Sequence, residues 1–222
     1  MNYKWDIIGN AGFQFLGKMN ASISHEIKNV LAIFNENAGL LNDYCLMADK
    51  GKPMDTERQK ALADNITRQV QRADSIVKNM NQLAHSVDRP VVQVDLGEII
   101  EFMANLSRRF ASMQDVILET VPPKGQVKII TNPFFLENLI WLCLYFAMNV
   151  SGEGKRIDLA SEAMEENGAK IRFARLEALE EPDMAMFPGE RERALLDALK
   201  GELETDMEAG EIVITLPGEI DR

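Results

Sequence analysis

The sequence has few of the features that indicate a secreted, membrane-embedded or nucleic-acid-binding protein. Only two of its 222 residues are cysteines, Cys45 and Cys143, and both lie in apolar helical sequence, so no disulfide framework is expected. The formal net charge of -11 argues against binding to a phosphate backbone, which requires a basic surface. The first residues lack the apolar core of a signal peptide.

Long hydrophobic runs are also missing. The most apolar run, residues 139–150, is shorter than the roughly 20 residues of a membrane span and predicts a buried core helix instead. An apolar fraction of 46% with 27% charged residues is typical of a globular protein. We therefore expect a cytoplasmic protein that binds neither a membrane nor nucleic acid.

The most informative stretch is residues 24–29, which read Ser-His-Glu-Ile-Lys-Asn within a long helical pattern. Apolar residues recur around it at helical spacing: Leu16, Met19, Ile23, Val30, Phe34, Leu41 and Cys45. His25 lies two positions from Ile23, about 200° around a helix, so it should face solvent while the stripe faces inward. Asn29 follows one turn later and Glu26 is adjacent. An exposed imidazole beside a carboxylate and an amide is a candidate nucleophile.

Two long helices joined by a short turn are predicted for the first part of the chain. The first spans about residues 12–47, and Gly51 with Pro53 ends it. The second begins at a cap residue, Asp55 or Thr56, and ends near His85. A lone antiparallel hairpin exposes half of its apolar stripe, so we expect a homodimer that buries it in a four-helix bundle. The early start of the first helix leads us to expect no sensor domain ahead of it.

The second part changes to alternating helices and strands after an extended linker at residues 90–94. Helices are predicted at 95–113 (capped by Asp95), 134–150 (after the cap Asn132 and Pro133) and 190–200. Short strands are predicted at 116–119, 127–130, 156–160, 170–174 and 211–217. The acidic residues 202–211 are expected to form a solvated face. This pattern predicts an α+β fold with helices against one face of a mixed sheet.

Together these features resemble bacterial two-component histidine kinases, over nearly the whole chain from about Gly12. Residues 15 and 16 resemble the Phe-Leu that leads into the family's phosphoacceptor box, and residues 24–29 resemble the box itself. A zinc motif is excluded because Asn29 stands where His-Glu-x-x-His needs its second ligand. The resemblance implies a dimerisation and histidine-phosphotransfer domain over residues 1–89. It implies an ATP-binding-type domain over residues 90–222.

The resemblance assigns roles to the residues of the box. His25 is the phosphoacceptor, and the Glu26 carboxylate orients the imidazole and takes its proton, which makes the other nitrogen nucleophilic. Asn29 stands where the family positions a water for dephosphorylation of the partner. Ser24, Lys28 and Ala32 are candidate partner-binding residues, and Lys28 suits an acidic partner surface.

The nucleotide site of the family is degenerate in this sequence. Leu142 and Phe146 stand where the family has its two asparagines, one of which holds Mg²⁺, and Asn149 is a substitute if the register shifts by one turn. No glycine follows Leu176 until Gly189, whereas phosphate cradling needs glycines. Phosphoryl transfer from ATP depends on positioning and on Mg²⁺. Because the residues that would supply either are missing here, we expect neither cofactor nor metal in this chain.

Three hypotheses remain. The first is a histidine phosphotransferase of kinase-like fold, which exchanges a phosphoryl group between His25 and a receiver-domain aspartate; the receiver of the response regulator supplies its own Mg²⁺. The second is a divergent ATP-dependent histidine kinase or phosphatase with Asn149 as metal ligand. The third is a non-enzymatic dimeric docking module for a response regulator.

Overall fold

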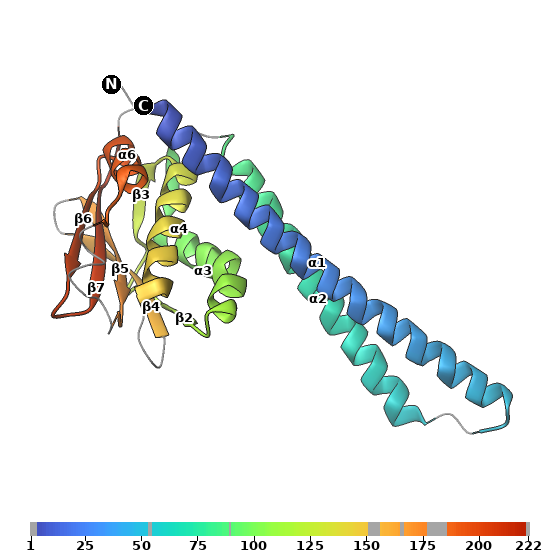
Figure 1. The fold of residues 1–222 in the computed structure, drawn as a ribbon. Coiled ribbons are helices and arrows are strands. Elements are labelled where there is room, and N and C mark those ends of the chain that lie inside the picture. The colour runs from blue at the N-terminus through green and yellow to red at the C-terminus, as the bar shows by residue number, and fades with distance from the viewer. Residues whose placement is uncertain are drawn as a thin grey trace. The chain divides into compact units, whose positions relative to one another are not determined.

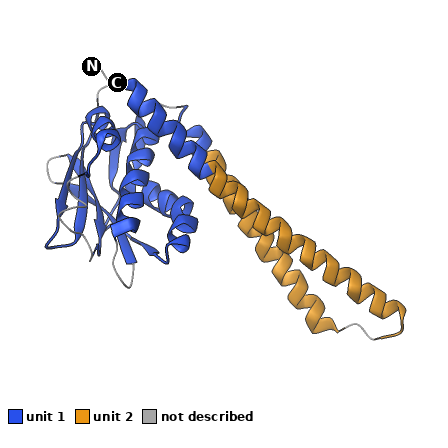
Figure 2. Ribbon diagram, in the orientation of Figure 1, with its two compact units in different colours: residues 1–19, 83–222 blue, residues 20–82 orange. Residues whose placement is uncertain are grey.

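The chain forms two compact units, which are described separately (Figure 2). The computed structural model describes residues 4–52, 55–88, 90–150, 156–164, 167–176 and 186–220. We call Asn20–Gln82 the first unit (orange, labelled unit 2 in Figure 2). The second unit combines Met1–Met19 with Leu83–Arg222 (blue, labelled unit 1 in Figure 2). Compared with the domain boundary expected at residue 90, this grouping assigns residues 1–19 and 83–89 to the second unit.

The first of these units is most of a long helical hairpin, as the sequence predicts. Helix α1 spans Trp5–Asp49 and helix α2 spans Thr56–His85. Asp55 caps α2, because its Oδ1 accepts a hydrogen bond from the backbone N–H of Glu57 at 3.0 Å. The hairpin interior contains one polar pair, in which Asn65 Nδ2 donates to Asn37 Oδ1 at 3.1 Å.

The apolar stripe of the hairpin is buried only in part. Ile23 and Val30 are buried, but Leu41 and Cys45, which were predicted to lie on the same inward stripe, are exposed. On α2, Val70 is exposed in the same way. The reason is geometric: two helices bury only the faces that they turn toward each other, and the rest of each stripe remains open.

The second unit is an α+β fold, which confirms the predicted fold class. Its five-stranded mixed sheet has the order β2-β4-β5-β7-β6. The strands are β2 (Ile117–Val121), β4 (Arg156–Met164), β5 (Gly168–Ala174), β6 (Glu202–Asp206) and β7 (Glu211–Pro217). Helices α3 (Leu96–Met113), α4 (Pro133–Val150) and α6 (Glu190–Leu199) lie on one side of it (Figure 1).

Helix α4 is the central core helix of this unit. Asn132 caps it, accepting a hydrogen bond from the N–H of Phe135 at 2.9 Å, and Pro133 occupies the first helical position as expected. By length and composition alone α4 could cross a membrane, but 67% of it is buried inside this unit. Burial in the protein core accounts for its apolar sequence.

For this unit one expectation was wrong and another was incomplete. The expected linker at residues 90–94 contains most of strand β1 (Val92–Asp95), which pairs antiparallel with β3 (Lys128–Thr131). The acidic stretch after residue 202 is not only a solvated face, because it forms edge strand β6, paired with β7. Its acidic side chains alternate outward, as a period of two allows.

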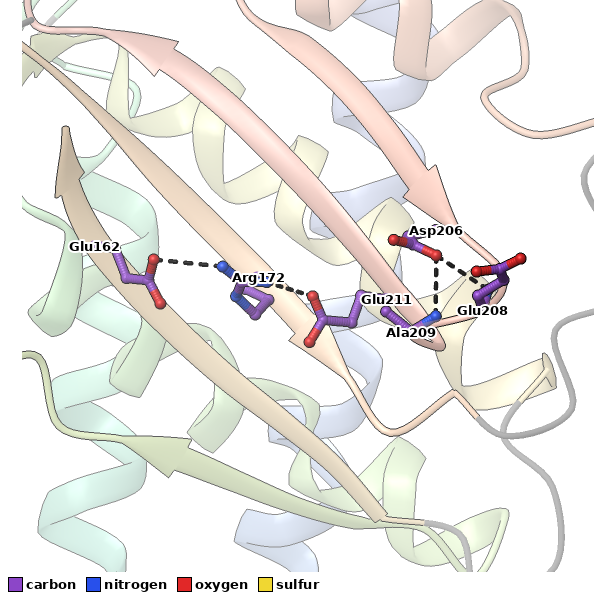
Figure 3. A network of polar contacts seen from close by, with 6 residues as sticks. All are labelled: Glu162, Arg172, Asp206, Glu208, Ala209 and Glu211. Carbon is purple, nitrogen blue, oxygen red and sulfur yellow. Dashed lines mark hydrogen bonds and ion pairs between the residues drawn. The ribbon is translucent and has the colours of Figure 1, made fainter.

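The open face of the sheet carries a charged network (Figure 3). Arg172 lies between two carboxylates: its guanidinium is 3.3 Å from Glu162 and also bonds Glu211. In the turn after β6, Asp206 Oδ1 accepts hydrogen bonds from the N–H groups of Glu208 and Ala209. The network joins three strands and closes a turn, so a structural role explains it.

The first turns of α1 belong to this second unit and pack on α4. Phe15 is buried with 1% of its surface exposed, and its ring lies 5.9 Å from that of Phe134. A Cβ atom added at Gly12 would lie 3.0 Å from the Phe134 ring, so glycine permits this close approach. Met19, one turn after Phe15, is fully buried.

Candidate functional site

The hexapeptide of residues 24–29 lies on α1 with the orientation that its spacing predicts. Ile23 and Val30 are buried, whereas His25 and Asn29 are exposed. Ser24, Lys28 and Ala32 are exposed as well, and Glu26 is half-buried. The imidazole is thus accessible to a second protein, on a helix whose opposite side is fixed by packing.

Glu26 has a partner that the sequence analysis missed. Its Oε2 lies 3.8 Å from a guanidinium nitrogen of Arg72, on the facing helix α2. The long separation and partial exposure make this a weak ion pair, but it brings the Arg72 guanidinium near Glu26, the residue that follows His25 in the sequence. The antiparallel register of the hairpin could have predicted this pair, because residues equally far from the turn face each other. Glu26 and Arg72 are nearly symmetric about the turn, as are Asn37 and Asn65.

The other histidine has a different environment. His85 ends α2, and its Nδ1 lies 2.8 Å from Asp88 Oδ2. Among the described residues, His25 has no hydrogen bond or ion pair of this kind. Both rings are exposed, so His85 provides a matched control for any chemistry assigned to His25.

The part of α4 where the sequence resemblance places a nucleotide site is lined by aromatic rings. Phe146, which replaces an expected asparagine, stacks on Phe187 with ring centroids 3.9 Å apart and an interplanar angle of 8°. Leu142, Phe146 and Asn149 all line a cavity of about 290 Å³ beside this pair. An aromatic ring offers no oxygen ligand for Mg²⁺, which prefers carboxylate and other oxygen donors.

Asn149 lies in the last turn of α4. Its Nδ2 donates to the carbonyl of Tyr145 at 2.8 Å, so its amide is partly satisfied by its own helix. The glycine-poor stretch predicted after Leu176 falls mainly on residues 177–185, which lie outside the described residues. The glycines predicted to end α4, Gly152 and Gly154, also lie outside them. Within the described ranges, no group of three His, Cys, Asp or Glu residues could hold a metal.

A buried acid lies near the start of α4. Glu137 has 1% of its surface exposed, and burial raises the pKa of its carboxyl from 4.5 to about 8, although a hydrogen bond from Ser86 opposes the shift. The neighbouring Asn138 is fully buried, and neither of its side-chain polar atoms has a partner among the described residues. Ser86 follows α2, so this polar group joins the end of the hairpin to the core helix.

One family model matches the chain: residues 15–87 match the His Kinase A (phospho-acceptor) domain. This match covers the hexapeptide and nearly all of the hairpin. It therefore supports a histidine-kinase-like first domain, as the resemblance in the sequence implied. No curated protein matches the chain.

Several solved structures of histidine kinases are distantly similar. Acinetobacter baumannii histidine kinase AdeS is 15% identical, with 83% of this chain and 96% of that chain covered and a TM-score of 0.49. The ATP binding domain of PrrB from Mycobacterium tuberculosis is 17% identical (59% and 98% covered, TM-score 0.46). Histidine kinase ThkA in complex with response regulator protein TrrA is 17% identical (93% and 63% covered, TM-score 0.45). Such low identities and TM-scores support no conclusion about activity.

Proposed function

We propose that this protein is a histidine phosphotransferase of two-component signalling. His25 exchanges a phosphoryl group with the aspartate of a response-regulator receiver domain, and ATP takes no part. The observation that carries the proposal is an exposed, otherwise unengaged His25 within a matched phospho-acceptor domain, in a chain whose second unit has Phe146 stacked on Phe187 in place of a metal ligand.

The chemistry requires little from this chain beyond a positioned nucleophile. The free imidazole nitrogen of neutral His25 attacks the phosphorus of the aspartyl phosphate in line. A nitrogen–phosphorus bond forms, the phosphorus–oxygen bond breaks, and the aspartate leaves as a carboxylate. In this proposal the adjacent Glu26 carboxylate accepts the proton of the other ring nitrogen and stabilises the charged ring as the bond forms. Arg72, on the facing helix, forms a weak ion pair with Glu26.

The phosphate donor is a protein because the second unit is poorly equipped to position ATP. Phosphoryl transfer from a nucleotide needs Mg²⁺ and donors around its phosphates. Here Leu142 and Phe146 occupy the relevant positions of α4, and the Phe146 ring is stacked on Phe187. A receiver domain brings its own Mg²⁺ with its aspartate, so this chain needs no metal.

A divergent ATP-dependent kinase is the second candidate. Two observations favour it: the matched model is that of a kinase phospho-acceptor domain, and Asn149 lines the same cavity as Phe146. A non-enzymatic docking module is the third, since an exposed helix face serves binding as well as transfer. The kinase differs from the main proposal in the phosphate donor of His25, which would be ATP. The docking module differs because its His25 would exchange no phosphate with a receiver.

The test starts from a chemically phosphorylated protein. Phosphoramidate phosphorylates accessible histidines without a kinase, and the labelled protein is then mixed with the receiver domains encoded near its gene. The proposal predicts rapid transfer to one receiver with loss of label from His25. His25→Ala should abolish this transfer, and His85→Ala should leave it unchanged. Retention of label on His25 with every receiver that binds would instead favour the docking module.

We further propose that the protein is a homodimer through its hairpin. Ile66, Val70, Ala73 and Val77 recur at intervals of four, three and four on α2, and both valines are exposed in the single chain. This is the spacing of a helix face that packs against other helices. A second copy would cover it and build a four-helix bundle.

Sedimentation velocity at low micromolar concentration tests this interface. Wild-type protein should sediment at twice the chain mass of 25.0 kDa. Val70→Asp combined with Val77→Asp should shift it to the monomer, because each charge would be buried unpaired. Val87→Asp, at an exposed valine beyond α2, is the matched control and should remain dimeric. A wild-type monomer would refute the interface.

A further inference from the structure

The cavity beside α4 combines aromatic rings with two cations. Trp141, Tyr145, Phe146 and Phe187 contribute to its wall, and its volume is about 290 Å³. Lys18 reaches it from the first helix, with Nζ 4.2 Å from the centroid of the Tyr145 ring and 5.6 Å from that of Trp141. Arg191 reaches it from the first turn of α6.

Among the residues that the structure describes, neither cation forms an ion pair. In the part of the chain that the structure describes, no carboxylate lies within 4.0 Å of Lys18 or Arg191, although Glu192 is also in the wall. The chain has a net charge of -11, so two cations without an ion pair among the described residues are notable. The Lys18 ammonium lies instead over the rings of Tyr145 and Trp141, which also line the cavity.

The lining and size restrict the ligand. Small-molecule sites are mostly apolar and aromatic with a few convergent polar groups, and their volumes begin at about 300 Å³. A cavity at this lower limit accommodates one or two fused rings but not a nucleoside triphosphate. Tyr145 is 40% exposed and lines the cavity, so an aromatic ligand can pack against it, and the two cations suit one anionic substituent.

We propose that this cavity binds a small planar aromatic carboxylate, with its ring against Tyr145 and Phe146 and its carboxylate between Lys18 and Arg191. The site does not depend on phosphotransfer at His25, because all of its residues belong to the second unit. Lys18 lines the cavity and lies on α1, the helix that also carries His25. Bound ligand therefore engages α1 directly.

Calorimetric titration of the full chain with 2-naphthoate tests the site. We expect saturable one-to-one binding, with 2-naphthamide (no charge) and cyclohexanecarboxylate (no aromatic face) each weaker by about tenfold or more. Lys18→Met and Arg191→Gln should each weaken naphthoate binding by a similar factor. Lys4→Met and Arg193→Gln remove the same charges outside the cavity and should bind like wild type.

Three results would overturn the proposal. They are the absence of saturable binding, equal affinity for naphthoate and naphthamide, and binding that neither Lys18→Met nor Arg191→Gln weakens. Displacement of naphthoate by ATP would also contradict it, because the proposed site is too small for a nucleoside triphosphate. Arg191 is exposed, so its variant should fold even if Lys18→Met loosens the contact between α1 and α4.

Discussion

Replacing the buried Glu137 by glutamine should change how stability depends on pH. In the folded protein the pKa of Glu137 is about 8, against 4.5 for the ordinary group, because burial disfavours the carboxylate. The folded state therefore retains a proton that the unfolded chain releases. Any contribution of this proton to stability is complete below about pH 4.5 and is lost progressively as the pH rises toward 8.

The size of the effect follows from the shift. From pH 4.5 to 7 the unfolded carboxyl ionises while the folded one does not, and at 1.36 kcal/mol per pH unit this lowers the free energy of unfolding by about 3 kcal/mol. Glu137→Gln removes this titration and retains a hydrogen-bond partner for Ser86. The variant should gain stability relative to wild type by about that amount between pH 5 and 7.5.

Urea unfolding at several pH values between 5 and 8 measures the difference. Because all other groups are shared, the difference in the free energy of unfolding between the two proteins reports on Glu137 alone. Glu101→Gln, at an exposed glutamate in the middle of α3, is the matched control and should follow wild type at every pH. A constant gap between Glu137→Gln and wild type across this range would refute the assignment of a protonated, buried Glu137.

Two further predictions concern the packing and capping of the second unit. Gly12→Ala should lower the melting temperature relative to Gly17→Ala by an amount corresponding to about 1–2 kcal/mol. The reason is that a Cβ at Gly12 meets Phe134 at 3.0 Å, whereas nothing lies within 4 Å of a Cβ at Gly17. Equal melting temperatures of the two variants would contradict this. Asp95→Ala should cost about 1 kcal/mol in urea unfolding by removing the 2.9 Å cap bond to the Gly97 N–H, and Asp95→Asn should restore most of it; a loss that Asn does not restore would contradict the cap.

Much of this fold is predictable because local signals decide it. The caps at Asp55, Asp95 and Asn132 fix three helix starts, and the periodicity around His25 gives its exposure correctly. Strand β6 was missed because its outward residues are all acidic, so hydropathy favours a solvated loop. Its pairing with β7 is decided by tertiary contacts, which override a weak local preference.

The parts of the candidate site that sequence reasoning missed depend on contacts between distant residues. No local pattern places Phe187 on Phe146 or Lys18 on Tyr145, because each pair is brought together only by packing on α4. The Glu26–Arg72 pair is intermediate in how far it can be predicted from the sequence. An antiparallel hairpin with a known turn predicts which residues face each other, so the register alone could have indicated it.

The central claim is that phosphate reaches His25 from a receiver protein and not from ATP. The direct measurement compares two donors for the same protein: ³²P-labelled ATP with Mg²⁺, and a ³²P-labelled phosphorylated receiver domain of its own signalling pathway. The account predicts acid-labile label from the receiver alone, lost in His25→Ala and retained in His85→Ala. Label acquired from ATP by the wild type and lost in His25→Ala would contradict it.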